Sequence, residues 1–262
     1  MNMIWNDIHF YSNTLGIQTA AYVLLPDHQT RLEHIDEPIP TLYLLHGLSD
    51  DYTGWMRYSR IEQYARKYYV AVVMPAVNRS FYTDMVHGAK YWTYVSEELP
   101  SLMESYFPLS KAREGRFAAG LSMGGYGAMK LGLLKPERYA AVAALSAPLW
   151  LQEALGEHET DPDFRRELID IFGSKEQMIQ GDGNLVLAAE KLKPDAAPRI
   201  YAACGTDDFL YEANEAFMGQ FQQKFGIQYH REPGASHTWD FWDNAIQDVL
   251  AWLPLTKTEN VW

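Results

Sequence analysis

Cysteine and basic residues are scarce in this chain of 262 residues. Cys204 is the single cysteine, which excludes an intramolecular disulfide and any zinc site built from several cysteines. Lysine and arginine number 22 against 34 aspartates and glutamates, so the formal net charge is −12. Because that balance repels phosphate backbones and anionic lipid surfaces, we expect neither nucleic acid nor a membrane as a partner.

Long apolar runs and a secretory signal are missing as well. No segment approaches the ~18 uninterrupted apolar residues of a membrane span. The opening stretch MNMIWNDIHF has no lysine or arginine and no apolar core, so we expect a cytoplasmic protein. What the chain does have is 47% hydrophobic residues without a repeat or a low-complexity linker. It is therefore predicted to form one domain over residues 1–262.

Short apolar runs alternate with longer helical patterns along the chain. This order predicts an α/β fold with a mostly parallel central sheet and helices on both faces. An antiparallel hairpin is expected from 7–12 and 17–26. Further strands are predicted at 41–47, 69–76, 115–122, 139–148, 199–208 and 227–237. Helical segments are predicted at 55–68, 91–107 with a break at Pro100, 125–139 and 239–253. The charged block at about 149–198 is predicted to be a helical excursion or partial lid.

The stretch RFAAGLSMGGYGAMK surrounds one serine with glycines. Gly120 to Gly124 match G-x-S-x-G, the nucleophile elbow in which Ser122 occupies a sharp turn between a strand and a helix. Side chains two positions before and after the serine would collide in such a turn, so glycine is required at both. An apolar strand pattern precedes the serine and a helix pattern follows it. We therefore predict Ser122 as a nucleophile.

A serine hydroxyl needs a base and an acid that orients the base. In elbow enzymes the chain order is serine, acid, histidine. His237 follows a strand in a glycine-containing loop and is the predicted base, whereas His230 lies within the strand pattern and His158 in the charged block. The acid is expected after the preceding strand, where Asp207 and Asp208 are adjacent. Chain geometry alone does not choose between them.

An oxyanion hole requires two backbone N–H groups aimed at the developing charge. The residue after the nucleophile, Met123, is expected to supply one. The loop after the strand at 41–47 is expected to supply the other, from Leu48 or alternatively from Gly47. His46 in the same loop is predicted to brace it and not to bind a metal or act as a base.

Six motifs, taken together, resemble the esterase D family of α/β-hydrolases, most closely its tributyrin esterase branch of small bacterial acyl esterases. The likeness covers nearly the whole chain. The motifs, in order, are LLHGLSDDYTGW, FYTDMVHG, SEELP, AGLSMGGYGAMKLGL, CGTDDFLYEAN and GASHTWDFW.

The resemblance implies an α/β-hydrolase fold and hydrolysis of small-molecule acyl esters, acetyl to butyryl, without metal or cofactor. It implies a triad of Ser122, Asp208 and His237, because the family's acid stands immediately before the pair Phe209–Leu210. Asp207 is then a turn residue. The resemblance is also compatible with a homodimer or a tetramer.

Two enzymatic alternatives stay open: a thioesterase of the S-formylglutathione hydrolase type and an acyltransferase. Ser49 stands where the family's thioesterases carry a cysteine, which argues against glutathione thioesters. A binding protein that has lost its chemistry is disfavoured because no triad member is missing.

Four further residues receive local predictions. The aromatic residues Trp55, Tyr82 and Trp92 are candidates for the substrate pocket, with core packing as the alternative. Cys204, inside an apolar strand pattern, is predicted to fill the core.

Overall fold

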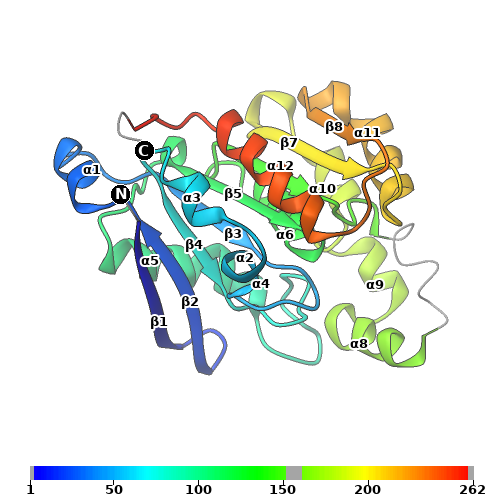
Figure 1. The fold of residues 1–262 in the computed structure, drawn as a ribbon. Helices are drawn as coiled ribbons and strands as arrows, with labels where there is room; N and C mark the ends of the chain where they lie inside the picture. Colours follow the sequence, from blue (N-terminus) through cyan, green and yellow to red (C-terminus); the bar gives the residue numbers. More distant parts are fainter. Residues whose placement is uncertain (1–2, 152–160, 259–262) are drawn as a thin grey trace.

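The computed structural model describes residues 3–151 and 161–258, whose strands form one eight-stranded sheet (Figure 1). The strand order is β1-β2-β4-β3-β5-β6-β7-β8. The β1–β2 and β2–β4 pairs are antiparallel and the other neighbours are parallel. The strands are β1 Ile4–Ser12, β2 Ile17–Leu25, β3 Thr41–Leu45, β4 Ala71–Pro75, β5 Arg116–Leu121, β6 Ala141–Leu145, β7 Arg199–Gly205 and β8 Gln228–Glu232. The predicted hairpin and the predicted parallel strands are thus present.

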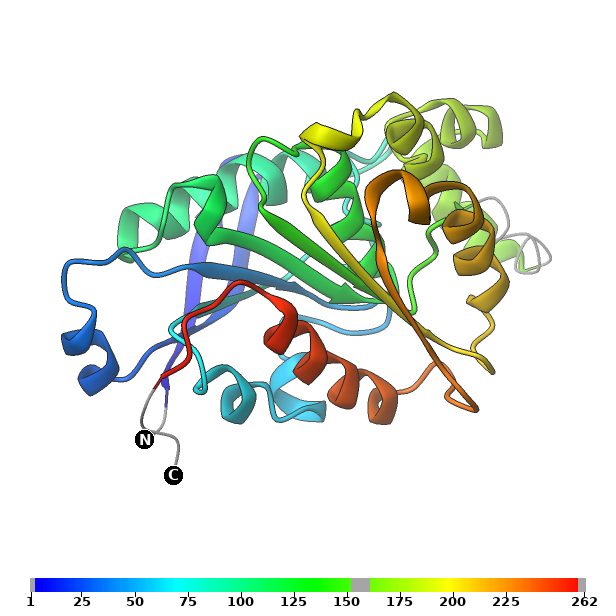
Figure 2. The same ribbon diagram turned by 90° about the horizontal axis from the view of Figure 1, so that it is seen from above.

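Helices cover both faces of the sheet (Figure 2). One face carries α3 (Ile61–Ala65) and α12 (Trp239–Trp252). The other carries α5 (Leu99–Tyr106), α6 (Met123–Leu134), α10 (Leu185–Lys191) and α11 (Tyr211–Phe225). Among the described residues, no helix is long and apolar enough to cross a membrane.

Alternate residues of the central strands enter two separate cores. In β3, Tyr43 and Leu45 pack under α5 and α6, whereas Leu42 and Leu44 pack under α3 and α12. Successive side chains of a strand point to opposite faces, so a strand buried on both sides reads as a continuous apolar run. Cys204 of β7 is fully buried, as predicted for a core residue.

Two predicted helical segments are interrupted in the structure. Residues 55–68 form α2 (Gly54–Tyr58) and α3, separated where the Ser59 hydroxyl donates to the Trp55 carbonyl and accepts from the N–H of Ile61. Such local side-chain bonds compete with the helical ladder.

The second interruption lies where Pro100 was expected to break the helix. There α4 (Tyr91–Thr93) runs into a π-helical turn, Tyr94–Glu98, before α5 begins. In this turn the Leu99 N–H donates to the Tyr94 carbonyl, five residues back. Pro100 is the second residue of α5 and offers no N–H to the Ser96 carbonyl four residues back, which accepts from the Arg138 guanidinium instead.

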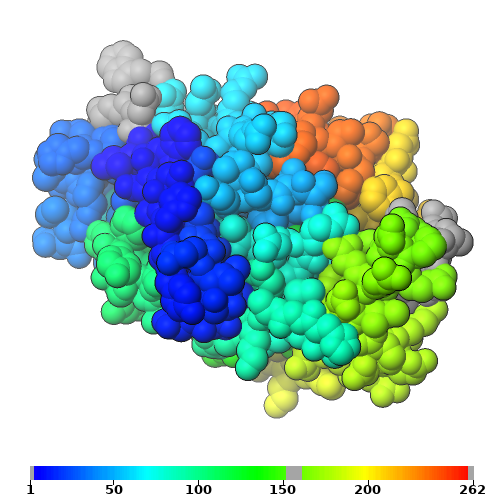
Figure 3. Space-filling model, turned by 90° about the horizontal axis from the view of Figure 1, so that it is seen from below, coloured from blue at the N-terminus to red at the C-terminus, as the bar shows by residue number. Residues whose placement is uncertain are grey.

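Helical segments fill much of the chain between β6 and β7. They are α8 (Pro162–Phe172), α9 (Lys175–Gln180), α10 and a 3₁₀ turn at Pro194–Ala196. The N–H groups of Val86 and His87 donate to the carbonyls of Ile171 and Asp170, so the loop after β4 lies beside α8 (Figure 3). Part of the predicted excursion, residues 152–160, lies outside the described residues. Its role as a lid stays a prediction.

The crossing of β5 and α6 leaves no room for a side chain at two glycines. A Cβ at Gly124 would lie 2.2 Å from the carbonyl oxygen of Leu45, and one at Gly120 would lie 2.4 Å from the carbonyl group of Gly124. Both contacts are with backbone atoms, which cannot rotate away. The structure thus shows the steric conflict expected for these glycines. For Gly124 the conflict is with the backbone of the neighbouring strand β3.

We expect Gly124→Ala to lower the free energy of unfolding by on the order of 3 kcal/mol or more, because strand and helix must separate to admit the methyl group. The matched control is Gly219→Ala in α11, where a Cβ meets no atom within 4 Å. That change should raise stability by roughly 0.5–1 kcal/mol, as expected inside a helix. Urea unfolding followed by circular dichroism measures both. Wild-type stability of Gly124→Ala would contradict the packing argument.

Candidate active site

Ser122 joins β5 to α6 in a strained conformation. Its φ is 52° and its ψ is −123°, a region that residues with a Cβ rarely adopt. The backbone is held there by the Ser122 N–H, which donates to the Leu145 carbonyl, and by the Ser122 carbonyl, which accepts the first helical bond from Tyr126. The turn leaves the serine half-buried although its neighbours in the strand and the helix are buried.

His237 and Asp208 meet this serine from two other strand ends. Nε2 of His237 lies 3.0 Å from Oγ of Ser122, and Nδ1 lies 2.9 Å from Oδ2 of Asp208. Asp208 follows β7 and His237 follows β8, so all three side chains lie beyond the carboxyl ends of parallel strands. With Nδ1–H donating to the carboxylate, the lone pair of Nε2 faces the serine hydroxyl.

The two adjacent acids occupy different environments. The Asp208 side chain is fully buried. Burial by itself would raise the pKa of this carboxyl, but hydrogen bonds from His237 and from the Leu210 N–H outweigh it and hold the pKa below its ordinary value. Asp207 is exposed, and its carboxylate accepts from the Thr206 hydroxyl at 3.2 Å. Only Asp208 therefore orients the imidazole in this structure.

Two aromatic rings fix His237 from the sides. The Phe209 ring centroid lies 4.6 Å from that of His237, and the Trp242 ring stands edge-on at 4.8 Å. Phe209 is 59% exposed, so it also forms part of the surface beside the imidazole. We did not predict either contact from the sequence. The available signal was position, since Phe209 directly follows Asp208 and Trp242 belongs to the motif that contains His237.

The loop after β3 lies close to the serine. A Cβ at Gly47 would lie 3.6 Å from Cβ of Ser122, which places Gly47, the residue before Leu48, beside the predicted nucleophile. Met123 is the first residue of α6, where N–H groups have no acceptor within the helix. These N–H groups and the start of the helix dipole favour negative charge at this point.

His46 braces the same loop, as expected. Its Nδ1 lies 2.7 Å from the Gly47 carbonyl oxygen, and its Nε2 accepts from the N–H of Val77. These partners require Nδ1 to carry the proton. Burial lowers the pKa of His46, which favours the neutral imidazole that this arrangement needs.

Two of the three aromatic residues predicted for the pocket are enclosed in the core, and the role of Trp92 stays a prediction. Trp55 is 1% exposed and its indole N–H donates to the Leu45 carbonyl. Tyr82 is fully buried, with its hydroxyl donating to the His46 carbonyl. Trp92 is half-buried and packs over the ammonium of Lys130. Trp55 and Tyr82 belong to the cores on opposite faces of the sheet, and each donates to a carbonyl at the end of β3 or just after it. The core-packing alternative therefore describes these two residues.

A polar groove of about 690 Å³ adjoins the candidate oxyanion loop. Leu48, Met85 and Phe164 supply its apolar part. Its charged and titratable residues are Arg79, His87, Asp161, Asp163, Arg166, Glu167 and Asp170. Acidic side chains outnumber the arginines, and Arg79 is paired with Glu167. The groove therefore disfavours anionic groups.

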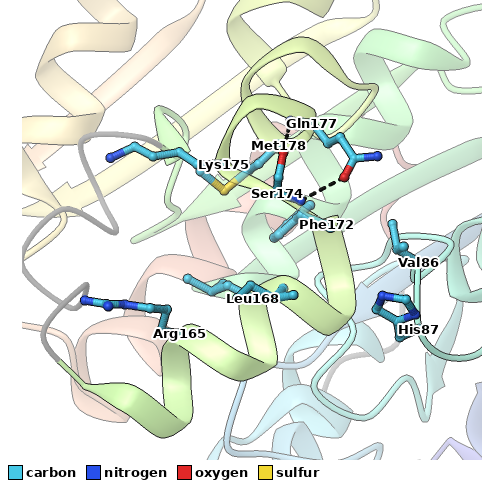
Figure 4. Close-up of a pocket in the computed structure, with 11 residues that line it drawn as sticks. Val86, His87, Arg165, Leu168, Phe172, Ser174, Lys175, Gln177 and Met178 are labelled. Atoms are coloured by element: carbon cyan, nitrogen blue, oxygen red, sulfur yellow. Dashed lines mark hydrogen bonds between the residues drawn. The ribbon is translucent and has the colours of Figure 1, made fainter.

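A second hollow, of about 600 Å³, lies farther along the same surface (Figure 4). It shares His87 with the groove and is lined mostly by apolar side chains of α8 and α9, including Leu168, Phe172 and Met178. Neither Leu48 nor any of the Ser122, Asp208 and His237 side chains belongs to its lining. Among the described residues, no group of three or more His, Cys, Asp and Glu could hold a metal ion.

Comparison with known proteins places this geometry among esterases. Residues 12–253 match the model of a family described as putative esterase. An acetyl esterase of Caldicellulosiruptor saccharolyticus is 33% identical over 260 residues, covering 94% of this chain and 96% of the relative. The comparisons support the predicted esterase relationship at this level, without singling out the tributyrin branch.

Two solved structures from Staphylococcus aureus superpose along almost the whole chain. The fluorophosphonate-binding serine hydrolase F is 32% identical with a TM-score of 0.87, covering 97% of this chain and 99% of that one. The S-formylglutathione hydrolase is 33% identical with a TM-score of 0.84 and the same coverage. The predicted α/β-hydrolase fold is thereby confirmed.

The environments of the two acids predict unequal effects of amide substitution. Asp208→Asn keeps the shape but favours the wrong imidazole tautomer, a change that costs about 10⁴-fold in kcat in a serine protease triad. We expect a loss of up to that order for p-nitrophenyl acetate. Asp207→Asn, the matched control, should stay within about twofold of wild type. Steady-state kinetics on both variants at equal folded stability measures this, and a reversed ranking would show that the acid is misassigned.

Proposed function

The chain belongs to the putative esterase family and is a serine esterase, and from that premise we propose that it hydrolyses short-chain carboxylic esters, acetyl to butyryl. The observation that carries the proposal is the hydrogen-bonded series Ser122, His237, Asp208. In it Ser122 is the nucleophile, His237 the general base and Asp208 the acid that orients the base.

Acylation follows from the positions of these atoms. Oγ of Ser122 attacks the ester carbonyl while Nε2 of His237 takes its proton, and Asp208 stabilises the imidazolium that forms. The carbonyl oxygen becomes an oxyanion that accepts hydrogen bonds from the N–H groups of Met123 and Leu48. His237 then returns the proton to the leaving alcohol, and Ser122 retains the acyl group.

Deacylation repeats these roles with water as the nucleophile. His237 takes a proton from the attacking water, and the same two N–H groups stabilise the second oxyanion. The proton then returns to Oγ of Ser122, which releases the carboxylic acid. The cycle uses no group beyond this chain, the ester and water.

The preference for short acyl chains is supported by the acetyl esterase that this chain resembles. Closely packed aromatic residues near the site give a second support. Phe209 lies against His237, while Tyr82 and Trp55 fill the space under the oxyanion loop.

Hydrolysis of S-formylglutathione is the second candidate, because the S-formylglutathione hydrolase of Staphylococcus aureus is 33% identical to this chain. Two features favour neutral esters over it. The groove beside Leu48 holds more acidic than basic side chains, which opposes the two carboxylates of glutathione. Ser49 also stands at the position where we expect a cysteine in the thioesterases. Parallel assays with p-nitrophenyl acetate and S-formylglutathione, compared by kcat/KM, separate the two.

The nucleophile assignment predicts that Ser122→Ala abolishes ester turnover and leaves the fold intact, since within the described part of the chain the hydroxyl bonds only to His237. Removal of a triad member in a serine protease leaves a residual rate about 10³–10⁴-fold above that in water. A fluorophosphonate probe should label Ser122 of the wild type and no residue of the variant. Labelling of another serine in Ser122→Ala would overturn the assignment.

The acyl-chain proposal predicts that kcat/KM for p-nitrophenyl esters peaks at or below butyryl. A methylene that fits a pocket improves transition-state binding by roughly 1–3 kcal/mol, so the rate should rise with length only until the pocket is full. Acetyl, butyryl, octanoyl and decanoyl esters, assayed below their micelle concentrations, test this. Equal kcat/KM for acetyl and decanoyl esters would refute it.

A further inference from the structure

A buried lysine in α6, the helix that follows Ser122, has no part in the proposed chemistry. Lys130 is 1% exposed, and its Nζ donates to the Tyr82 carbonyl at 3.1 Å and to Oγ1 of Thr83 at 2.9 Å. The ammonium also lies 4.8 Å from the centre of the Trp92 ring. Burial lowers the pKa of Lys130 to about 7, but the amine donates to both acceptors in either protonation state. Within residues 3–151 and 161–258 its hydrogen-bond partners are a carbonyl and a hydroxyl and not a carboxylate, which is unusual for a lysine in a core.

The loop that Lys130 holds has a strained backbone. Phe81 and Tyr82 have φ values of 47° and 49°, a conformation that bulky residues adopt only where their surroundings enforce it. The Tyr82 ring lies directly on α6, because a Cβ at Gly127 would come within 2.6 Å of that ring. Gly127 and Lys130 are three residues apart on one helix face, so α6 holds Tyr82 by its ring and by its carbonyl.

From α6, Tyr82 reaches the candidate oxyanion loop. Its hydroxyl donates to the His46 carbonyl at 3.0 Å. The imidazole of His46 in turn holds the Gly47 carbonyl and the Val77 N–H. The Gly47 carbonyl belongs to the same peptide group as the N–H of Leu48. A continuous series of buried contacts thus leads from Lys130 through Tyr82 and His46 to the peptide at Leu48.

We propose that Lys130 and Tyr82 are positioning residues that fix the Leu48 half of the oxyanion hole relative to α6. Because α6 also begins at Met123, both N–H donors are then held to the same helix. This inference rests on the proposed function, since it assigns the two residues a role in the reaction of Ser122. Its physical basis is the narrow tolerance of an oxyanion hole, whose donors must lie 2.7–3.1 Å from the developing charge.

The decisive comparison is Tyr82→Phe against Tyr126→Phe. Both tyrosines are fully buried and each donates one hydrogen bond to a backbone carbonyl, Tyr82 to His46 and Tyr126 to Gly183. The two changes therefore remove the same atom and the same kind of bond. Tyr126 also contacts Thr83 and lies 5.9 Å from the Lys130 ammonium, so it shares these neighbours with Tyr82. Of the two hydroxyls, only that of Tyr82 bonds to the oxyanion loop.

We expect Tyr82→Phe to lower kcat about tenfold with KM within twofold of wild type. Loss of a whole oxyanion donor costs about 10²–10³ in kcat, and a displaced donor should cost a part of that. Tyr126→Phe should leave both constants within twofold, with a similar fall in Tm. Equal kcat values for the two variants would overturn the proposal, as would a change of Tyr82→Phe confined to KM.

Lys130→Met tests whether the lysine acts through Tyr82. If it does, the double variant Lys130→Met/Tyr82→Phe should lose no more kcat than the worse of the two single variants, because both changes interrupt one series of contacts. Losses that multiply would show that Lys130 acts independently and would overturn its assignment. Should Lys130→Met fail to fold, the two tyrosine variants still decide the role of Tyr82, and Lys130→Arg replaces it in the cycle.

The proposed function is checked in the same experiment. Wild-type hydrolysis of p-nitrophenyl acetate together with an inactive Ser122→Ala variant establishes the reaction. If that result is obtained and Tyr82→Phe is as active as Tyr126→Phe, the positioning role is wrong but the proposed function still holds. If Ser122→Ala is active, the proposed function itself is wrong.

Discussion

The close approach of α6 to the end of β3 is the constraint on which the site depends. The helix begins so near the strand that a methyl group at Gly124 would lie 2.2 Å from the Leu45 carbonyl oxygen. This contact presses the first turn of α6 against the loop at His46 and Gly47. Under the proposed function, this contact keeps the N–H of Met123 and the peptide of Leu48 close to Ser122 before any substrate arrives. A hole preorganised in this way needs no rearrangement when charge develops.

The parallel sheet supplies the rest of the site by a different means. Ser122, Asp208 and His237 follow β5, β7 and β8, and the carboxyl ends of parallel strands lie along one edge of the sheet. The loops after these strands bring the three side chains within hydrogen-bond distance, although β6 lies between β5 and β7 and 115 residues separate Ser122 from His237. The two partners differ in burial. The Asp208 side chain is enclosed, with hydrogen bonds that keep its pKa low, whereas the imidazole of His237 is partly exposed at the surface.

Some parts of the site and fold could be predicted from the sequence and others could not, and the difference has physical reasons. The elbow at Ser122 was readable because a steric demand fixes glycine at two nearby positions. The aromatic residues were not, since an aromatic side chain suits a pocket wall and a core equally well, and only the packing shows that Tyr82 is enclosed. The break at Ser59 was missed because it depends on one hydroxyl competing with the helix. Asp208 and Asp207 were separable by resemblance alone, since the direction of a side chain leaving a strand depends on the turn.

The acidic character of the chain bears on turnover under the proposed function. Ester hydrolysis converts a neutral substrate into an alcohol and a carboxylate, so only the product carries a negative charge. The groove beside Leu48 carries Asp161, Asp163 and Asp170, and its Arg79 is paired to Glu167. In a protein of net charge −12, this field leaves the binding of a neutral ester unopposed and disfavours retention of the acid. The same field that argues against nucleic acids and glutathione thioesters therefore favours release of the product.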